Sequence, residues 1–467
     1  MFTIFHSSIV LVRSAFTRGP HTLTVSAELF KLNRQKLCER LRTNSEVPRG
    51  GFVLLQGGIS ETRHCSDHEP VFRQESYFHW TFGVEEPDFY GAIEVDTGKA
   101  ILFQPKLPES YAVWMGKLLS TEDFRNSYGV DEVYWSSEIA KVLTEKKASI
   151  LLVMMSFTEF GKTCKQATFD GISNRVLKTE MEIEVIRYAN RITSEAQVEV
   201  MKQVRPGMYE YQLVSGPSGA ILWYGHAGAP NAKQLKDGEM CFVDLNGEYY
   251  HYTSDITCCY PVNGKFTEKQ RGIHDAVCKS NKAVLKAAKP GVCWVDLHKM
   301  ADRIHLEELK KIGLVRGDVD EMVKVRLGRV FFPHGLGHLL GVDTLDVGNC
   351  NESTERREAE GVPNLRTERI LQPNMVMTVE PGIYFIDAHL DKALNNPEQT
   401  PFLNTDLIEE YRGFGGVRVE DTIVITENGA ELLTCASVPR TVEEIEAVMA
   451  EGKKSHVSLP QDDARLS

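Results

Sequence analysis

Imidazole and carboxylate side chains stand inside apolar, glycine-containing sequence at three places in the second half of the chain. An unpaired charge is costly to bury in such surroundings unless a cation or a partner compensates it. A bound metal ion is the simplest explanation of the pattern. The three segments are FPHGLGH at 332–338, TVEPGIY at 378–384 and FGGVRVE at 414–420.

Two further carboxylates, Asp244 in FVD and Asp255 in SDIT, occur upstream in similar apolar and β-branched sequence. Ligation dominated by oxygen with one imidazole favours a hard divalent ion such as Mn²⁺ over a zinc site built from thiolates. Four carboxylates carry the charge that two divalent ions would neutralise, and such pairs of ions activate water. The candidate metal ligands are Asp244, Asp255, His338, Glu380 and Glu420.

His334 and His338 lie four residues apart, which is the spacing of the histidines in helical HExxH zinc sites. The intervening prolines and glycines make a helix improbable, and the glutamate of that motif is absent. We therefore expect His338 to bind metal from a strand or loop and His334 to act beside it. Single-residue explanations remain open, since Glu380 could pair with a base and Asp255 could cap a turn.

The overall composition limits the possible functions. The 467 residues include 53 basic and 65 acidic side chains, a net charge of -12, which argues against a broad nucleic-acid surface. No apolar run has the length of a membrane-spanning helix. The ten cysteines include no CxxC pair, which is typical of free thiols in a reducing, cytoplasmic setting. The first 27 residues lack acidic side chains, so a mitochondrial presequence is the alternative.

Strand-like and helix-like runs alternate in the first third of the chain, which predicts an α/β domain. We expect strands at 52–55, 90–95 and 100–103, and helices at 29–41, 112–119 and 138–144.

A long helix is predicted to begin at Thr179, because Thr179 and Glu182 match a capping box. The motif RPG at 205–207 ends it. The expected organisation is a poorly ordered N-terminal extension at 1–24, an α/β domain at 25–172, a catalytic domain at 173–450 and a disordered tail at 451–467.

The second domain contains a weak internal repeat, which suggests two related halves. RPGMYEYQL at 205–213 is similar to KPGVCWVDL at 289–297. A helix is predicted at 296–312 after the second copy, whereas no equivalent helix follows the first. An exposed loop is expected at 351–368.

Six motifs give the chain a family resemblance. It resembles the metal-dependent aminopeptidases of the pita-bread fold, and within them the prolidase type, which hydrolyses Xaa-Pro dipeptides. The resemblance covers about 29–450 and implies a mixed α/β domain followed by a pita-bread catalytic domain. The motifs are FRQES at 72–76, YGHAGAPN at 224–231, SDITC at 254–258, PHGLGH at 333–338, TVEPGIYF at 378–385 and FGGVR at 414–418.

The resemblance also implies a cofactor, partners and residue roles. Two Mn²⁺ ions per subunit would be bridged by Asp255 and Glu420 and would activate a hydroxide. Glu380 would relay its proton, and His334 would stabilise the oxyanion. A homodimer is implied, in which the N-terminal domain of one subunit helps to close the site of the other. The expected substrate contacts are Arg366 on the terminal carboxylate, Arg418, His226 and Trp114.

Three features depart from the family pattern. Trp223 and Leu345 stand where the family has histidines, one segment is missing after Leu213, and a shorter one is missing near 172–176. Two alternatives to an active dipeptidase therefore remain. One is a metal-binding relative with impaired catalysis, and the other is a non-enzymatic pita-bread protein that binds a peptide or partner.

Overall fold

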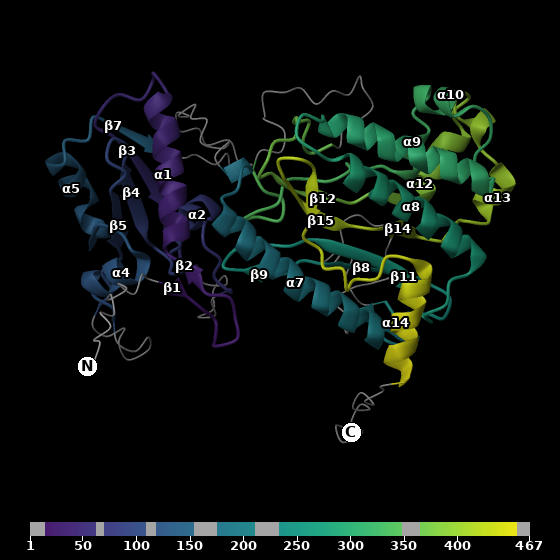
Figure 1. Cartoon of the computed structure of the whole chain (residues 1–467), viewed down its shortest axis with the longest axis horizontal. Coiled ribbons are helices and arrows are strands. Elements are labelled where there is room, and N and C mark those ends of the chain that lie inside the picture. Colours follow the sequence, from purple (N-terminus) through teal and green to yellow (C-terminus); the bar gives the residue numbers. More distant parts are fainter. Residues whose placement is uncertain are drawn as a thin grey trace, which may run out of the picture. The chain divides into compact units, whose positions relative to one another are not determined.

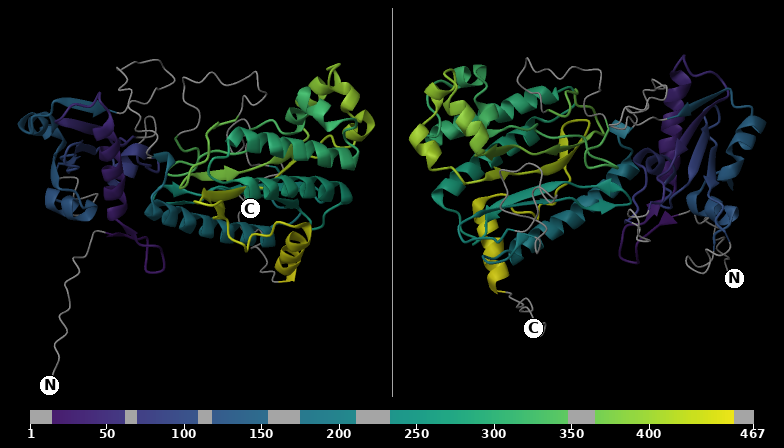
Figure 2. Two further views of the ribbon diagram at one scale, coloured as in Figure 1. Left: turned by 45° about the horizontal axis from the view of Figure 1, so that its top comes forward. Right: turned by 180° about the vertical axis from the view of Figure 1, so that it is seen from behind.

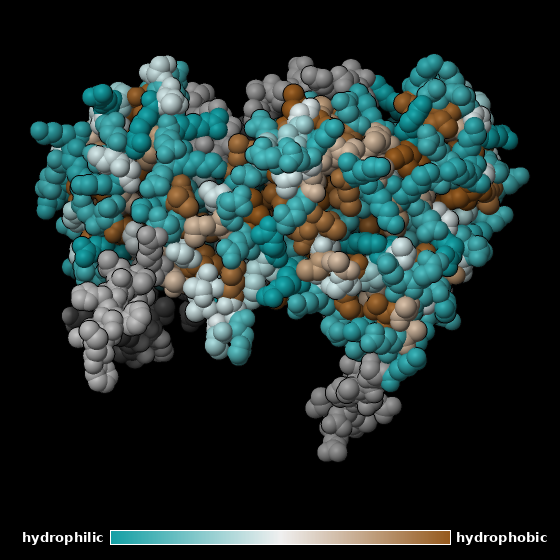
Figure 3. All heavy atoms as spheres, viewed as in Figure 1, coloured by the Kyte–Doolittle hydropathy of each residue, from teal (hydrophilic) through white to brown (hydrophobic). Residues whose placement is uncertain are grey.

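The computed structural model divides the chain into two compact units, Met1–Arg175 and Val176–Ser467 (Figure 1). No helix in the described ranges is long and apolar enough to cross a membrane. Hydrophilic residues cover most of the visible face of each unit (Figure 3). The structure describes residues 15–61, 70–108, 118–153, 175–210, 233–347 and 365–454.

The first unit is built on a mixed sheet of five strands in the order β6-β5-β4-β3-β7. Strands β3, β4 and β5 form an antiparallel meander, while β7 pairs parallel to β3 and β6 pairs parallel to β5. The predicted α/β character of this region is therefore confirmed. The strands are β3 Gly51–Gln56, β4 Tyr90–Glu94, β5 Ala100–Gln104, β6 Glu132–Trp135 and β7 Ile150–Val153.

Local capping signals explain where the helices of this unit begin and end. Ser120 and Asp123 form a capping box at the start of α4, and Gly129 ends that helix with a left-handed backbone, as glycine readily does. The predicted helix at 112–119 lies almost entirely outside the described residues. The helices are α1 Glu28–Thr43, α2 Ser76–Phe82, α4 Thr121–Tyr128, the 3₁₀ turn η2 Ser136–Glu138 and α5 Ile139–Glu145.

The segment expected to be an N-terminal extension is partly structured. Strand β1, Ala15–Phe16, pairs with β2, Val25–Ser26. The ring of Phe16 stacks on Tyr128 at 5.6 Å. This aromatic contact gives residues 15 onward a reason to be ordered, so the expectation is wrong for that part of the extension. Residues 1–14 lie outside the described ranges.

The second unit begins with the predicted long helix, α7 Glu180–Gln203, whose capping box joins Thr179 and Glu182. A hairpin of two buried strands follows, β8 Met240–Leu245 and β11 Ile256–Pro261. Between them lies a smaller hairpin of β9, Glu248–Tyr249, and β10, Tyr252–Thr253.

The remainder of the second unit has two long helices, short helices and further strand pairs. Strands β12 and β16 both pair with β15, and β13 pairs with β14. The elements are α8 Glu268–Ala287, α9 Trp294–Ile312, α10 Val319–Lys324, α11 Gly328–Phe331, β12 Val376–Val379, β13 Gly382–Tyr384, α12 Asp387–Leu394, η5 Thr400–Phe402, α13 Thr405–Glu409, β14 Gly416–Arg418, β15 Asp421–Ile425, β16 Ala430–Leu432 and α14 Val442–Lys454.

Both faces of the β8–β11 hairpin are buried, and alternate residues enter different cores. Met240 and Phe242 pack with α8 and the β13–β14 pair, whereas Cys241 and Val243 pack with α7 and α14. In Figure 1 the strands lie between α8 with α9 on one side and α7 with α14 on the other, and Figure 2 shows the same layers from two further directions. A strand buried on both faces reads as a continuous apolar run, and a carboxylate at its end is therefore conspicuous in the sequence.

The two halves proposed from the repeat share one backbone arrangement. In the first half, the amide of Gly207 donates to the carbonyl of Leu235 at 2.8 Å, and the amide of Leu235 donates to Met208 at 2.7 Å. In the second half, Gly291 and Leu371 form the same pair of bonds at 2.9 Å, with Val292 as the second acceptor. Both glycines have a positive φ, +92° and +87°. The segment after Leu213, where we expected a missing helix, lies outside the described residues.

The C-terminal helix is longer than expected. Helix α14 continues through Lys454, although residues from 451 were expected to be disordered. Gly452 is buried, and a Cβ there would lie 2.2 Å from the carbonyl oxygen of Lys202. This close packing on α7 explains why the helix does not end sooner. Residues 455–467 lie outside the described ranges.

Candidate metal centre

Two strand pairs bring three of the candidate ligands together. Asp244 lies on β8 directly opposite Thr257 of β11, and Asp255 immediately precedes β11. The amide of Glu420 donates to the carbonyl of Thr257 at 3.1 Å. This bond joins the residue before β15 to the β8–β11 hairpin, so the carboxylates of Asp244, Asp255 and Glu420 lie close together.

His338 comes from a segment that runs beside β12, and Glu380 directly follows β12. The amide of Thr378 donates to the carbonyl of His338 at 2.9 Å, and the amide of Glu380 donates to Leu336 at 2.8 Å. A Cβ at Gly337 would lie 2.1 Å from the carbonyl oxygen of Thr378, so only glycine permits this approach. The histidine motif is extended and not helical, as its proline and glycines predicted.

The resulting cluster is compact. His338 Nε2 lies 3.5 Å from Asp255 Oδ2 and 3.7 Å from Glu380 Oε1. One ligand atom from each of Asp255, His338 and Glu420 lies within 4.8 Å of the others. His338 Nδ1 lies 3.0 Å from the carbonyl oxygen of Leu339, which can only accept, so Nδ1 carries the proton. The lone pair of Nε2 therefore points into the cluster, as ligation requires.

The carboxylates repel one another in the absence of a cation. Burial, followed by the negative charges of Glu420, Asp244 and Glu380, raises the pKa of Asp255 well above its ordinary value. Burial and the charge of Glu380 act in the same way on the pKa of Glu420. Such shifts mark an arrangement in which the ionised carboxyls need compensation.

Two buried carboxylate oxygens of this cluster form no hydrogen bond with the described residues. They are Asp255 Oδ1 and Glu420 Oε1. An unsatisfied buried acceptor calls for an explanation, and a cation between these two carboxylates supplies one. The residues present therefore fit a divalent metal ion, with oxygen donors and one imidazole as such ions prefer.

Arg418 is the only cation in direct contact with the carboxylates of this cluster among the described residues. Its guanidinium forms an ion pair with Asp244, and its Nε lies 3.0 Å from Thr257 Oγ1 and 3.5 Å from Glu420 Oε2. The group also lies 4.7 Å from the centre of the Phe242 ring. The structure places the buried side chain of Arg418 against the candidate ligands, and the substrate contact expected of it stays a prediction. One guanidinium compensates only part of the charge of four carboxylates.

His334 lies at the edge of the cluster, with Nδ1 4.0 Å from Glu380 Oε2. Its Nδ1 donates to the carbonyl of Gly335 at 2.7 Å, and Nε2 lies 2.7 Å from the hydroxyl of Tyr384. Burial lowers the pKa of His334 to about 3, and the nearby charge of Arg418 acts in the same direction. The ring is therefore neutral, and Nε2 accepts the hydrogen bond from Tyr384.

The remaining predicted residues are placed as follows. Burial lowers the pKa of His338, and among the smaller influences Arg366 also lowers it, so exposed Arg366 lies within electrostatic reach of the cluster. Leu345, which follows His338 on the same loop, is 43% exposed. Trp114, His226 and Trp223 lie outside the described residues.

The sequence analysis missed the residues that support the ligands. Thr257 Oγ1 donates to Glu420 Oε2, and Thr378 Oγ1 lies 3.4 Å from Glu380 Oε1 and accepts the amide of His338. Each threonine stands next to apolar strand residues in the sequence and carries no charge, so neither is conspicuous. Only their positions beside the predicted ligands could have suggested a role, since Thr257 ends the SDIT motif and Thr378 lies two residues before Glu380.

Comparisons with known proteins agree with this architecture. Residues 213–427, which contain all five candidate ligands, match the model of metallopeptidase family M24, and residues 30–151 match the N-terminal domain of aminopeptidase P. The chain is 52% identical to the Xaa-Pro dipeptidase of Homo sapiens over 93% of its length and 96% of the relative's. It is 51% identical to that of Mus musculus, over 96% of this chain and 98% of the relative.

Solved structures of aminopeptidase P are also similar to this chain. Escherichia coli aminopeptidase P with the inhibitor Pro-Leu has a TM-score of 0.73 and 30% identity, covering 92% of this chain and 99% of the other. Aminopeptidase PepP of Pseudomonas aeruginosa also scores 0.73, with 27% identity and the same coverage. The chain belongs to metallopeptidase family M24. It is a metallopeptidase of the pita-bread fold, preceded by an α/β domain, as the resemblance implied.

Proposed function

We propose that this metallopeptidase hydrolyses Xaa-Pro dipeptides and that two Mn²⁺ ions serve as its cofactor. The observation that carries the metal site is the pair of unsatisfied buried oxygens on Asp255 and Glu420, which lie in a cluster with His338 Nε2. The relatives that share about half of its residues are Xaa-Pro dipeptidases, which supports the choice of substrate.

The proposed ligands are Asp244, Asp255, His338, Glu380 and Glu420. Divalent ions held there supply Lewis acidity and lower the pKa of water toward neutrality. Four carboxylates carry more negative charge than one divalent ion and Arg418 together would neutralise, which favours two divalent ions. Mn²⁺ is proposed because the donors are mostly oxygen.

Glu380 is proposed as the group that moves the proton. Its Oε2 lies 3.8 Å from Arg418 Nη1 and 4.0 Å from His334 Nδ1, so the carboxylate is placed but not locked by strong hydrogen bonds. A positioned carboxylate can take a proton from attacking water and deliver it to the nitrogen of the departing proline.

Arg366 and Arg418 are proposed to have different roles. Exposed Arg366 is proposed to bind the terminal carboxylate of the dipeptide, for which a guanidinium is well suited. Buried Arg418 is proposed to hold Asp244 and Glu420 in position, because its contacts run to those ligands and to Thr257.

His334 is proposed to stabilise the oxyanion that forms at the scissile carbonyl. The single proton of its neutral ring is directed at the carbonyl of Gly335. To donate to the substrate, the ring must give up its bond to Gly335. The Tyr384 hydroxyl, which is bonded to Nε2, is proposed to help the ring move its proton from one nitrogen to the other.

Several further assignments extend the proposal. We infer a homodimer in which Trp114 of one subunit and His226 contribute to substrate binding, and a cytoplasmic location. The first unit would then serve dimerisation and closure of the site, while the second carries the chemistry.

The deciding experiment is hydrolysis of Gly-Pro by purified, Mn²⁺-loaded protein, beside Glu380→Ala and Arg303→Ala variants with metal analysis of all three. Arg303 lies on the surface of α9 and pairs with Asp320, so it is a matched control. Activity in the parent and in Arg303→Ala that is lost in Glu380→Ala supports the proposal. Bound metal without activity in the parent would identify the impaired alternative, which the exposed Leu345 at the site favours. A protein without metal or activity would identify a binding module.

A further inference from the structure

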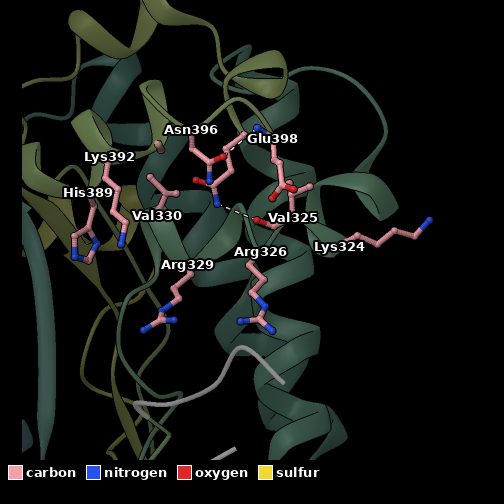
Figure 4. Close-up of a pocket in the computed structure, with 11 residues that line it drawn as sticks. Lys324, Val325, Arg326, Arg329, Val330, His389, Lys392, Asn396 and Glu398 are labelled. Atoms are coloured by element: carbon pink, nitrogen blue, oxygen red, sulfur yellow. Dashed lines mark hydrogen bonds between the residues drawn. The ribbon is translucent and has the colours of Figure 1, made fainter. Parts of the chain in front are cut away.

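A pocket lies in the M24 unit on elements that carry none of the candidate ligands. It has a volume of about 460 Å³ and is formed where the end of α10, helix α11 and helix α12 meet the loop that follows α12 (Figure 4). Its lining residues are Lys324, Val325, Arg326, Arg329, Val330, His389, Lys392, Ala393, Asn396, Glu398 and Gln399.

The charged side chains of this pocket are predominantly basic. Figure 4 shows Arg326 and Arg329 side by side, with Lys392 and the ring of His389 directed to the same side, while Lys324 points away. Glu398 is the single acidic residue of the lining. The pocket is therefore positive in a chain whose net charge is -12.

Helix α12 separates its charges between two surfaces. Asp387 and Asp391 pair with Arg412 at 2.9 and 2.6 Å, and so they are unavailable to the pocket. His389 and Lys392 enter the lining instead, and neither side chain forms a hydrogen bond or ion pair with another described residue. Helix α12 thus delivers only positive or neutral groups to the pocket.

Arg329 on α11 is likewise without an ion pair or side-chain hydrogen bond to the described part of the chain. This contrasts with other cations of the unit, since Lys269, Arg271 and Lys279 all lie within 2.6 Å of a carboxylate. The positive side chains of Arg329 and Lys392 line one pocket and repel each other, and a bound anion would relieve that repulsion.

The backbone supports the same conclusion. Arg326 follows α10 in a left-handed conformation with a φ of +56°, a position that glycine usually fills. The floor is rigid, because Val330 and Ala393 are buried in the large apolar core and Gln399 Nε2 donates to the carbonyl of Val325 at 2.9 Å. The cationic groups therefore stand on fixed elements around a closed base.

We propose that this pocket binds a small, multiply charged anion that carries phosphate groups. Its volume exceeds what a single inorganic ion fills and suits a small metabolite. The guanidinium of Arg329 and the ammonium of Lys392, both in the lining, match phosphate oxygens as a fork of donors and a point charge. Glu398 is the only carboxylate of the lining, which is too little negative charge to bind a ligand with several positive charges.

The experiment is isothermal titration of the Mn²⁺-loaded protein with fructose 1,6-bisphosphate as the probe and with fructose as the uncharged control. The pocket variant is Arg329→Gln/Lys392→Gln. The matched control is Lys286→Gln/Lys289→Gln, which removes the same charge from exposed positions at the end of α8. Peptidase activity of each variant confirms that it is folded.

We expect saturable binding of the bisphosphate, no binding of fructose, and an affinity that falls about tenfold or more in the pocket variant but not in the control. Affinity should also decrease with added salt. Absence of saturable binding would overturn the proposal. So would equal losses in both variants, which indicate non-specific attraction, or full binding in the pocket variant, which indicates the metal centre as the site.

Discussion

Lys178 Nζ lies 2.8 Å from Asp346 Oδ2, and each side chain is only 1% exposed. The pair joins the residue before the α7 capping box to the loop that follows His338. The amide of Asp346 donates to Leu339 at 2.9 Å, directly beside the proposed ligand. A Cβ at Gly341 would lie 2.3 Å from Asp346 Oδ2 and 2.9 Å from Lys178 Cε. This buried ion pair is therefore tightly enclosed and fixes the ligand-bearing loop to the helix.

Lys178→Met is expected to reduce the free energy of unfolding by about 3–5 kcal/mol, because it leaves the Asp346 carboxylate buried without the positive charge of Lys178. Chemical denaturation measures this loss, and metal analysis should show weaker Mn²⁺ binding. The exposed pair Arg187–Glu431, 2.9 Å apart and 46% exposed on each side, provides the control, since Arg187→Met should cost at most about 1 kcal/mol.

The double variant Lys178→Met/Asp346→Leu is expected to recover much of the lost stability, because it removes both charges together. Metal affinity should remain reduced in that variant if the pair positions His338. A loss below about 1 kcal/mol in Lys178→Met would contradict the assignment of this pair as a buried anchor.

Removal of metal by a chelator should lower the melting temperature. Buried Asp255 and Glu420 then face each other without a divalent ion, and a bound ligand at a thousandfold excess over its Kd contributes about 4 kcal/mol to stability. Calorimetry with and without Mn²⁺ tests this, with Glu420→Gln expected to lose most of the metal effect. Glu427→Gln, at an exposed position on the following turn, should retain it. Equal melting temperatures for the loaded and chelated protein would refute the proposed metal centre.

Leu345→His is expected to raise kcat/KM for Gly-Pro. A histidine there would add a polar donor on the loop after His338, and one such donor is worth about 10²–10³ in rate at a preorganised site. Steady-state kinetics measure the change, and Leu345→Ala controls for the loss of an exposed leucine. If both variants behave like the parent, this position does not reach the substrate.

Acid should destabilise the protein partly through His305. Burial, with the charge of His298 in addition, lowers the pKa of His305 to about 3, whereas the unfolded chain has a pKa of about 6.5. Between these values the unfolded state binds a proton that the folded state does not. The free energy of unfolding therefore falls as pH falls through that window, by up to about 1.4 kcal/mol per pH unit for this group.

His305→Gln should make the pH dependence of the free energy of unfolding shallower between about pH 6.5 and 3, because the titrating ring is gone. Glutamine is chosen because its amide can still bond Ser280, whose hydroxyl lies 2.7 Å from His305 Nε2. Urea unfolding at several pH values measures the slope. The difference between parent and variant at pH 8 reports packing alone and serves as the internal control. An unchanged slope would show that His305 is not protonated on unfolding in this range.

Much of the fold and of the candidate site could be predicted because the signals are local. Thr179 and Glu182 fix the start of α7 within four residues, and the glycines of the histidine motif exclude a helix. Asp244 and Asp255 are conspicuous because they interrupt apolar strands. In each case the residue's immediate neighbours carry the information.

Contacts between distant segments could not be predicted in this way. Nothing near Lys178 points to Asp346, since either residue alone reads as an ordinary surface charge. The contacts that hold Arg418 among the carboxylates likewise come from β8 and β11, which are far from it in the sequence. Residues 15–24 and 451–454 were expected to be poorly ordered because the contacts that order them are far away in the sequence. Phe16 stacks on Tyr128, and Gly452 packs on Lys202.

The order of the proposed ligands along the chain has a consequence for biosynthesis. Asp244 is synthesised first, whereas Glu420 and Arg418, the cation that pairs with Asp244, are synthesised last. The β8–β11 hairpin meets these late segments through several bonds, among them those of Glu420 and Arg418 with Thr257, so a nascent chain on the ribosome has no complete set of candidate ligands. A divalent ion held by these residues would therefore be loaded into an essentially finished protein.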